Sequence, residues 1–222
     1  MPYGAEEGCR GTVTISIISV EGARLYRPDG EDEVYPSVTT ILAATGPRKY
    51  GLERWKAQHG EAGDVLRDIA ANRGKRLHAA IAHFRSTGEA PKNPDPFWLS
   101  VESFVRFLCG MFPRFAAEHP MIHAVDGYGG TPDDVSVTAD HQLVIHDWKS
   151  GTKPKDKAQL EECFVQIGGY ADLVAFNSES RPTRAAVVVA IPNREPQVVP
   201  VNLARWVPEW RRRLEMYKGS MS

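Results

Sequence analysis

The chain has 222 residues, of which 42% are apolar and 25% charged. This length and composition are those of one globular domain large enough for an α/β fold. The net charge of −1 excludes a global basic field, so any binding of nucleic acid has to come from local patches. No run approaches the ~18 apolar residues of a membrane-spanning helix. The N-terminus also lacks a basic-then-apolar secretion signal, so we expect a cytoplasmic protein.

The N-terminal third begins with elements that the sequence marks clearly. Residues 12–20 alternate and are rich in β-branched side chains, which predicts a strand. Residues 23–35 predict a hairpin around the turn Arg27-Pro28-Asp29-Gly30. A helix is expected over residues 38–44, with Ser37 as its N-cap and Gly46-Pro47 at its end.

A locally basic helical region follows. Between Arg48 and Arg85 the chain has nine Lys/Arg and four Asp/Glu. A short helix over residues 50–59 is either a solvated surface helix or a basic, aromatic lip for single-stranded nucleic acid, and its candidate binding residues are Arg54, Trp55 and Lys56. Residues 61–86 are expected to be mostly helical with a break near residues 72–74, and their apolar stripe comprises Ile69, Leu77, Ile81 and Phe84.

The next segment predicts a long helix over residues 97–119, with an apolar face of Phe104, Phe107, Leu108, Met111 and Phe115. A strand over residues 121–125 should then lead into the centre of the fold. We assign no site residue to this segment.

The stretch from Gly130 to Lys149 predicts a β-hairpin, because two runs rich in Val, Ile and Thr flank the polar turn at residues 139–142. Antiparallel pairing brings the start of the first strand, at Asp133, beside the end of the second, at Asp147. Side chains alternate along a strand, so Asp147 and Lys149 share a face.

Two converging carboxylates repel each other, and a divalent cation relieves that repulsion. Oxygen ligands without a Cys or His pair favour Mg²⁺ or Mn²⁺ over zinc. A lysine beside such a metal can orient or deprotonate a water and stabilise a phosphate's developing charge. The chemistry that these residues suggest is metal-assisted hydrolysis of a phosphodiester. The alternative is an ordinary salt pair between Asp147 and Lys149 at the end of a strand.

The C-terminal third continues the pattern of strands and helices. The loop of residues 150–157 holds three lysines and either contacts phosphates or is merely solvated. A helix over residues 158–177 places Gln166 and Tyr170 on one face, as an exposed polar pair or as residues directed at the site. Strands are expected over residues 184–191 and 197–201, and a closing helix over residues 203–217.

These residues also carry a resemblance. Gly130-Thr131-Pro132-Asp133 followed by Asp147-Trp148-Lys149 resembles the core of the PD-(D/E)xK nuclease superfamily. The segment from Gln166 to Tyr170 resembles the QxxxY helix motif of its RecB-like branch, and the segment from Gly74 to His78 resembles the GxxxH motif of the same branch. The wider pattern is similar to the mitochondrial genome maintenance exonucleases and their phage relatives.

The resemblance implies a fold and a set of roles. The fold would be α/β, with a restriction-endonuclease-like core in which helices flank a central mixed β-sheet, preceded by an N-terminal β-hairpin and helical region. Residues 1–222 would form a single nuclease domain, with residues 1–95 as the N-terminal strands and basic helical arch and residues 96–222 as the catalytic core. The implied metal ligands are His78, Asp133, Asp147 and the Trp148 carbonyl, and the implied catalytic set is Asp133, Asp147, Lys149, Gln166 and Tyr170.

The implied substrate is DNA, single-stranded or with free ends, in recombination, repair or replication in a bacterial or phage-infected cell. The candidate nucleic-acid-binding residues are Arg54, Trp55, Lys56, Arg73, Lys75, Arg76, Ser150 and Lys153. Mg²⁺ or Mn²⁺ is the expected cofactor, and no membrane partner is expected. An iron–sulfur cluster is not expected, because it needs four Cys ligands and the chain has three widely spaced cysteines. A non-catalytic nucleic-acid-binding module on the same fold and a structure-specific endonuclease remain the alternatives.

Overall fold

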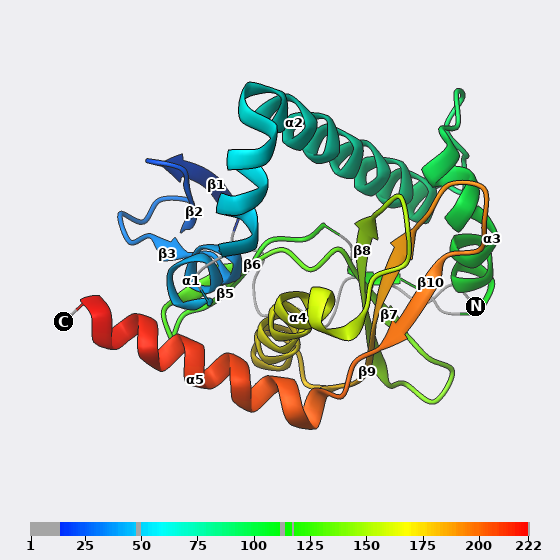
Figure 1. Cartoon of the computed structure of the whole chain (residues 1–222). Helices are drawn as coiled ribbons and strands as arrows, with labels where there is room; N and C mark the ends of the chain where they lie inside the picture. Colours follow the sequence, from blue (N-terminus) through cyan, green and yellow to red (C-terminus); the bar gives the residue numbers. More distant parts are fainter. Residues whose placement is uncertain (1–13, 48–49, 112–113, 117, 222) are drawn as a thin grey trace.

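The computed structural model describes residues 14–47, 50–111, 114–116 and 118–221, and the side chains of residues 50–59, 61, 114–116 and 221 lie outside the described set. Its elements, shown in Figure 1, are β1 (Ile15–Val20), β2 (Ala23–Pro28), β3 (Tyr35–Pro36), α1 (Val38–Thr45), α2 (Tyr50–Thr87), α3 (Pro96–Met111), β4 (Arg114–Ala116), β5 (Met121–His123), β6 (Tyr128–Gly130), β7 (Asp134–Val137), β8 (Leu143–Ser150), α4 (Lys157–Asn177), β9 (Pro182–Ala190), β10 (Gln197–Pro200) and α5 (Leu203–Met221).

The centre of the fold is a five-stranded mixed sheet in the order β10-β9-β8-β7-β4. The β7–β8 hairpin is antiparallel, with Asp134 opposite His146 and Val137 opposite Leu143, as the sequence predicts. The β8–β9 pair is parallel, and α4 makes the crossover between these two strands. The expected α/β class, with helices flanking a mixed sheet and an N-terminal hairpin, is confirmed.

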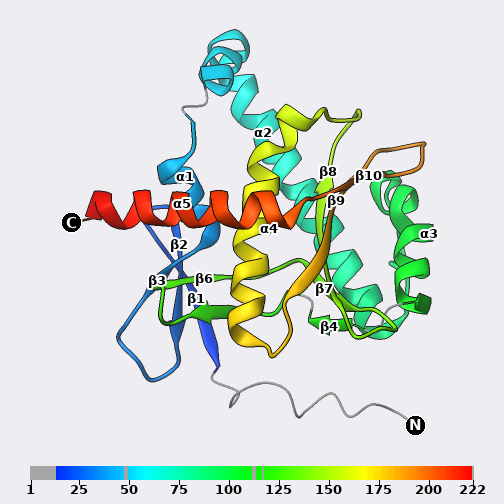
Figure 2. The same ribbon diagram turned by 90° about the horizontal axis from the view of Figure 1, so that it is seen from below.

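Helices cover the sheet on two sides, and each side has its own core (Figures 1 and 2). The larger core lies between the sheet and α1, α4 and α5, and it includes Ile145, Val187 and the fully buried Trp210. The smaller core lies between the sheet and α2 and α3, and it includes Leu77, Trp98 and Trp148. Alternation along β8 sends Ile145 to one core and Trp148 to the other, so the strand is buried on both faces.

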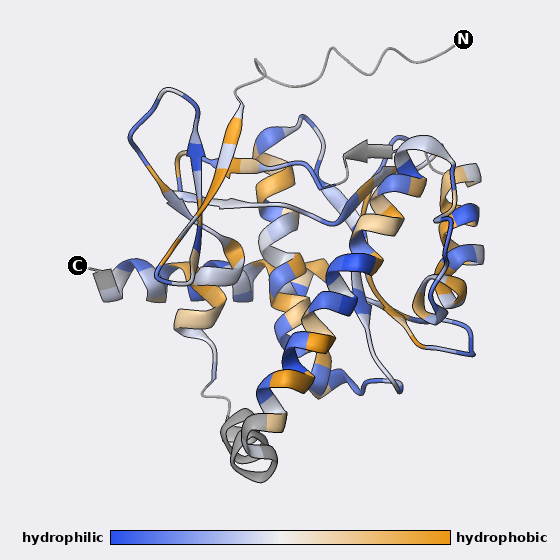
Figure 3. Ribbon diagram, turned by 90° about the horizontal axis from the view of Figure 1, so that it is seen from above, coloured by the Kyte–Doolittle hydropathy of each residue, from blue (hydrophilic) through white to orange (hydrophobic). Residues whose placement is uncertain are grey.

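Helix α2 differs from its sequence prediction in two ways. Its break lies at Gly60, whose φ of 52° is one that glycine adopts without a steric cost, and residues 72–74 are continuously helical. Leu77, Ile81 and Phe84 are buried as expected, but Ile69 is 55% exposed, since the sheet lies only under the second half of the helix. Figure 3 shows hydrophilic and hydrophobic residues interspersed along α2.

The segment after α2 also departs from the prediction. The expected helix over residues 97–119 ends at Met111, two residues before Pro113, whose ring and missing N–H stop a helix. The buried stripe of α3 contains Trp98, Val101, Val105 and Leu108, whereas Phe107 and Met111 are more than half exposed. The strand expected over residues 121–125 is β5, which pairs with β6 in a separate two-stranded sheet.

The N-terminal strands form a three-stranded sheet in the order β1-β2-β3. Ser37 caps α1 as predicted, since its Oγ accepts a hydrogen bond of 2.9 Å from the Thr40 backbone N–H. No helix in the described part of the chain is long and apolar enough to cross a membrane.

Candidate metal and catalytic site

The candidate site lies where β8 leaves the core, between α2 on one side of the sheet and α4 on the other. Asp133 precedes β7, and its side chain reaches across the hairpin, where Oδ2 accepts a hydrogen bond of 2.8 Å from the Trp148 backbone N–H. The two ends of the hairpin therefore meet as the sequence predicts. Asp147 points to the α4 face of the sheet, because its neighbours Ile145 and Trp148 pack into opposite cores.

Helix α2 brings His78 onto this end of the hairpin. Its Nε2 donates a hydrogen bond of 2.7 Å to the Trp148 carbonyl oxygen, and its Nδ1 lies 3.4 Å from Asp133 Oδ1. Burial favours the neutral ring, but the carboxylates of Asp133 and Glu118 outweigh burial and raise the pKa of His78 to about 10. His78 thus lies in the site, as the GxxxH resemblance implies.

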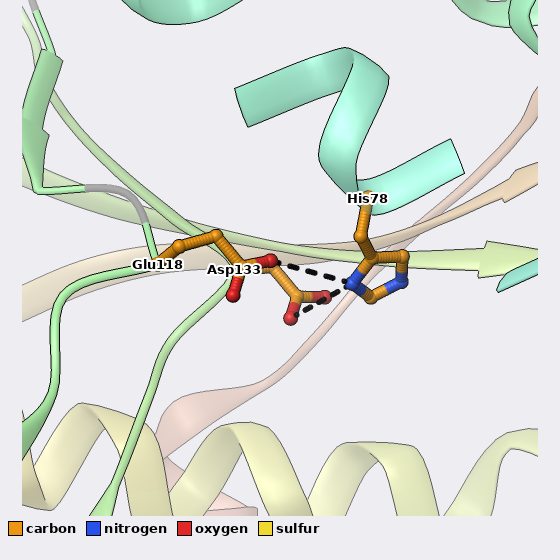
Figure 4. A group of neighbouring side chains, drawn as sticks. All are labelled: His78, Glu118 and Asp133. Carbon is orange, nitrogen blue, oxygen red and sulfur yellow. Dashed lines mark ion pairs between the residues drawn. The ribbon is translucent and has the colours of Figure 1, made fainter. Parts of the chain in front are cut away.

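Glu118 is a site residue that the sequence did not reveal. Its Oε1 lies 3.6 Å from His78 Nδ1, and Figure 4 shows Glu118 and Asp133 both directed at that nitrogen. The Glu118 backbone N–H donates to the Pro132 carbonyl at 3.2 Å, which fixes it beside Asp133. Its φ of +50° is unusual for a residue with a side chain. No local signal in the sequence marks Glu118, because the predicted helix over residues 97–119 includes it.

Asp147 is fully buried, and its one close polar partner among the described residues is Lys149, whose Nζ lies 2.6 Å from Oδ2. Asp147 Oδ1 has no hydrogen-bond partner among the described residues. Burial raises the pKa of Asp147 to about 6, with the charge of Lys149 opposing the rise and that of Asp133 adding to it. A buried carboxylate with unsatisfied oxygens is costly unless something else binds it.

The donor set fits a hard divalent cation. His78, Glu118 and Asp133 each offer one atom within 4.8 Å of the other two. Asp147 lies outside this group of three, next to Trp148, whose backbone N–H donates to Asp133. These are oxygen and imidazole donors without a thiolate, which suits Mg²⁺ or Mn²⁺. The Trp148 carbonyl already accepts from His78 and keeps a second lone pair, so its role as a metal ligand stays a prediction.

Gln166 and Tyr170 share one face of α4, and Tyr170 is buried in the larger core. Gln166 Nε2 donates to Tyr170 Oη at 2.8 Å. Burial, together with the charge of Asp133, raises the pKa of Tyr170, so the phenol keeps its proton. The glycines between them have a packing role: a Cβ on Gly168 would lie 2.3 Å from the Trp206 carbonyl oxygen of α5.

The predicted nucleic-acid-binding residues divide into three groups. Arg73 Nε donates to Ser150 Oγ at 3.2 Å, which joins α2 to the end of β8 beside the site. Lys75 and Arg76 are exposed on α2, and Lys153 is exposed in the loop after β8. The side chains of Arg54, Trp55 and Lys56 lie outside the described residues.

A second group of metal-binding residue types, His123, Asp126 and Asp172, is already neutralised. Arg211 of α5 forms ion pairs with both Asp126 and Asp172, and Lys218 lies 3.3 Å from Asp126. Two cationic side chains take the place that a metal would occupy, so this group ties α5 to α4 and to the β5–β6 turn.

Comparison with known proteins adds little to this geometry. No protein-family model matches the chain, and no curated protein matches its sequence. Among solved structures, "Crystal structure of SSO0001" aligns over 84% of this chain and 78% of that chain, with 16% identity and a TM-score of 0.40. A similarity of this size carries no argument about fold family or function.

Proposed function

We propose that this protein is a Mg²⁺- or Mn²⁺-dependent nuclease that hydrolyses phosphodiester bonds in DNA. The observation that supports the proposal is the group of His78, Glu118 and Asp133 at the end of the hairpin, beside the fully buried Asp147, which is paired with Lys149 at 2.6 Å. Perturbed, converging ionisable groups at a strand end are typical of functional sites. The resemblance to the PD-(D/E)xK nucleases supports the same chemistry.

Four side chains would bind the metal. Asp133, Asp147, His78 and Glu118 hold the cation, which when bound neutralises the carboxylates and polarises the phosphate. The Nε2–H of His78 donates to the Trp148 carbonyl, which fixes the ring so that Nδ1 faces the carboxylates. The Trp148 backbone N–H donates to Asp133 Oδ2, which fixes the orientation of the Asp133 carboxylate.

Lys149 supplies the cationic group beside the acids. Its ammonium would orient the attacking water and stabilise the charge that develops on the phosphate oxygens. The salt pair with Asp147 holds Nζ at the edge of the site, and 26% of the Lys149 side chain remains exposed. The phenol of Tyr170 and the amide of Gln166 would support Lys149 or the substrate backbone from α4.

The substrate strand would pass between α2 and the loop after β8, where Arg73, Ser150 and Lys153 lie. We favour an exonuclease that acts on single strands or free ends in the cytoplasm of a bacterial or phage-infected cell. This preference rests on the resemblance to the genome maintenance exonucleases. The competing functions, a structure-specific endonuclease and a binding module without catalysis, predict different products in the same assay.

The test is cleavage of 5′- and 3′-labelled single- and double-stranded DNA with Mg²⁺, with Mn²⁺ and with a chelator. The proposal predicts metal-dependent cleavage, and a loss of at least about 100-fold in Lys149→Ala and Asp147→Ala, the scale on which electrostatic catalytic groups contribute. Asp68→Asn, which changes an exposed acid on α2, is the matched control and should keep full activity. Undiminished cleavage in both site variants would remove the proposed site, and metal-independent binding without cleavage would favour the binding module.

A further inference from the structure

The loop between β8 and α4, residues 151–156, carries two lysines just beyond the candidate site. Lys153 is exposed and Lys155 is half-buried, and among the described residues neither forms an ion pair. Loops with unpaired lysines are usually mobile, and a mobile cation loses entropy when it binds a phosphate. The backbone of this loop is nevertheless held at three points.

Two of these points lie at the ends of the loop. At the start, the Gly151 N–H donates to the Ala190 carbonyl of β9 at 3.0 Å. At the end, Asp156 and Gln159 form a capping box, in which each side chain accepts from the other residue's backbone N–H at 2.8 and 3.1 Å. Such contacts are common where a strand passes into a helix.

The third point lies in the middle of the loop and comes from a distant residue. The Gln197 side chain, at the start of β10, accepts from the Lys155 N–H through Oε1 at 2.9 Å and donates through Nε2 to the Lys155 carbonyl at 2.7 Å. A primary amide has a donor and an acceptor side by side, which lets one Gln side chain satisfy both backbone groups of one residue. The amide contacts the Lys155 main chain and leaves its ammonium available.

The fixed loop directly follows Ser150, the last residue of the strand that carries Asp147 and Lys149. Lys155 Cε also lies 3.6 Å from the point where a Cβ on Gly151 would stand, so the side chain folds back over the end of β8.

We propose that Gln197 is a positioning residue for nucleic acid: by clamping the Lys155 peptide it presents Lys153 and Lys155 to the phosphates of the substrate strand next to the scissile bond. The inference rests on the proposed function for the identity of the ligand. Because the clamped loop is already ordered, its lysines lose less conformational entropy when they bind phosphates. Removing the two hydrogen bonds of Gln197 should therefore weaken binding even though both lysines remain.

The experiment measures binding of a fluorescein-labelled single-stranded oligonucleotide by anisotropy, from 50 to 200 mM salt and with a chelator, so that cleavage is not needed. Gln197→Met keeps the length of the side chain and removes both hydrogen bonds. Gln142→Met is the matched control, since Gln142 bonds to Thr183 at the opposite end of β8. Both changes are also made in a Lys153→Ala/Lys155→Ala background.

We expect Gln197→Met to weaken binding about three- to tenfold and to lower the slope of log K against log salt by up to about 1.4, the value for two lost phosphate contacts on a single strand. Gln142→Met should bind like the wild type. In the background without the two lysines, Gln197→Met should change affinity by less than twofold, because the residue acts through them. In the cleavage assay the loss should appear in KM rather than in kcat.

An unchanged affinity and salt slope in Gln197→Met would overturn the inference, and so would an equal loss in the background without the lysines. If Gln197→Met folds less stably than Gln142→Met, the same cycle is run at a lower temperature at which circular dichroism shows both variants fully folded. If the wild type binds DNA without cleaving it, the nuclease proposal is rejected. If the variants still show the expected affinities, the role of Gln197 in binding is retained.

Discussion

At the scale of single residues, the site is built from charges that the fold does not fully satisfy. Asp147 is buried with Lys149 as its neighbouring cation, and a buried charge of this kind costs several kcal/mol unless its partners are well placed. Asp134, the residue after Asp133, shows the contrast. It is equally buried, but it accepts from Arg85 at 3.1 and 3.2 Å and from Ser136 at 3.2 Å. Asp147 has Lys149 as its one close partner and an Oδ1 without a hydrogen bond, which is why we propose that it binds a ligand.

Strand alternation is sufficient to predict Asp133, Asp147 and Lys149 from the sequence, because the side-chain direction in a hairpin follows from the register. It also separates Asp147 from His146, which the structure places against Asp134 on the opposite face. Glu118 could not be predicted in the same way. It lies outside any regular element, and its position depends on a backbone contact with Pro132 and on a left-handed φ.

The group around Asp126 gives a pH-dependent prediction for stability. Partial burial alone would raise the pKa of Asp126, but hydrogen bonds from Arg211 and Lys218 outweigh it and hold the pKa below 3.8, while His123 also faces the group at 3.3 Å. A lowered pKa means that the stabilisation is present above pH 3.8 and is lost as the pH falls through the folded-state value.

Asp126→Asn should therefore cost about 1 kcal/mol at pH 7 and at pH 5, a modest figure because Arg211 is partly exposed and solvent screens the pair. The cost should shrink below pH 3.8. Urea unfolding of the two proteins at pH 7, 5 and 3 measures the difference. A cost that is the same at all three values would contradict the assignment of the lowered pKa to these ion pairs.

At the scale of elements, α4 and α5 approach closely because α4 has two consecutive glycines. A Cβ on Gly168 would lie 2.3 Å from the Trp206 carbonyl oxygen, and one on Gly169 would lie 2.9 Å from the Trp210 ring. The sequence pattern from Gln166 to Tyr170 thus combines two requirements. Gln166 and Tyr170 are the polar pair that we propose acts at the site, and the glycines between them admit α5.

Gly168→Ala should destabilise the protein by about 1–3 kcal/mol, because the contact is with backbone atoms that cannot move away without displacing α5. Gly110→Ala in α3 is the control: a Cβ there meets no described atom within 4 Å, so the helix should gain about 0.5–1 kcal/mol. Urea unfolding at pH 7 compares the two. Equal stability of Gly168→Ala and wild type would show that the helices are not in close contact.

The elements were predicted well where their ends carry a local signal and poorly where tertiary packing decides. The capped helix α1 and the β7–β8 hairpin follow from capping and turn chemistry. The exposure of Phe107 and Met111 could not be predicted. Helix α3 has apolar residues around much of its surface, and the sequence does not show which of them face the sheet. The bend of α2 lies at Gly60, where the sequence offered only a glycine among helix-forming residues.

At the scale of the whole molecule, α2 is part of the central core rather than an appendage. Leu77, Ile81 and Phe84 supply one wall of the core around Trp98 and Trp148, and Arg85 neutralises the buried Asp134. The same helix carries His78 into the site. Site and core are therefore coupled through one element, and the sequence could indicate this only through the spacing of the apolar residues around His78.

A chain that begins at residue 96 should consequently fail to fold. Loss of each large apolar side chain costs about 2–5 kcal/mol, and leaving Asp134 buried without Arg85 costs about 3–5 kcal/mol more. Together these come to about 9–20 kcal/mol, as much as or more than the roughly 5–15 kcal/mol that stabilises a typical domain. Calorimetry should show no cooperative transition for this fragment, and a cooperative melt would show that residues 96–222 form an independent core.

The central claim is that the ends of the β7–β8 hairpin hold a divalent cation. Its most direct test is a crystal structure grown with Mn²⁺, with anomalous scattering used to locate the metal. The account predicts a peak within about 2.5 Å of carboxylate oxygens of both Asp133 and Asp147. No peak there at millimolar Mn²⁺, with the metal found only elsewhere on the molecule, would contradict it.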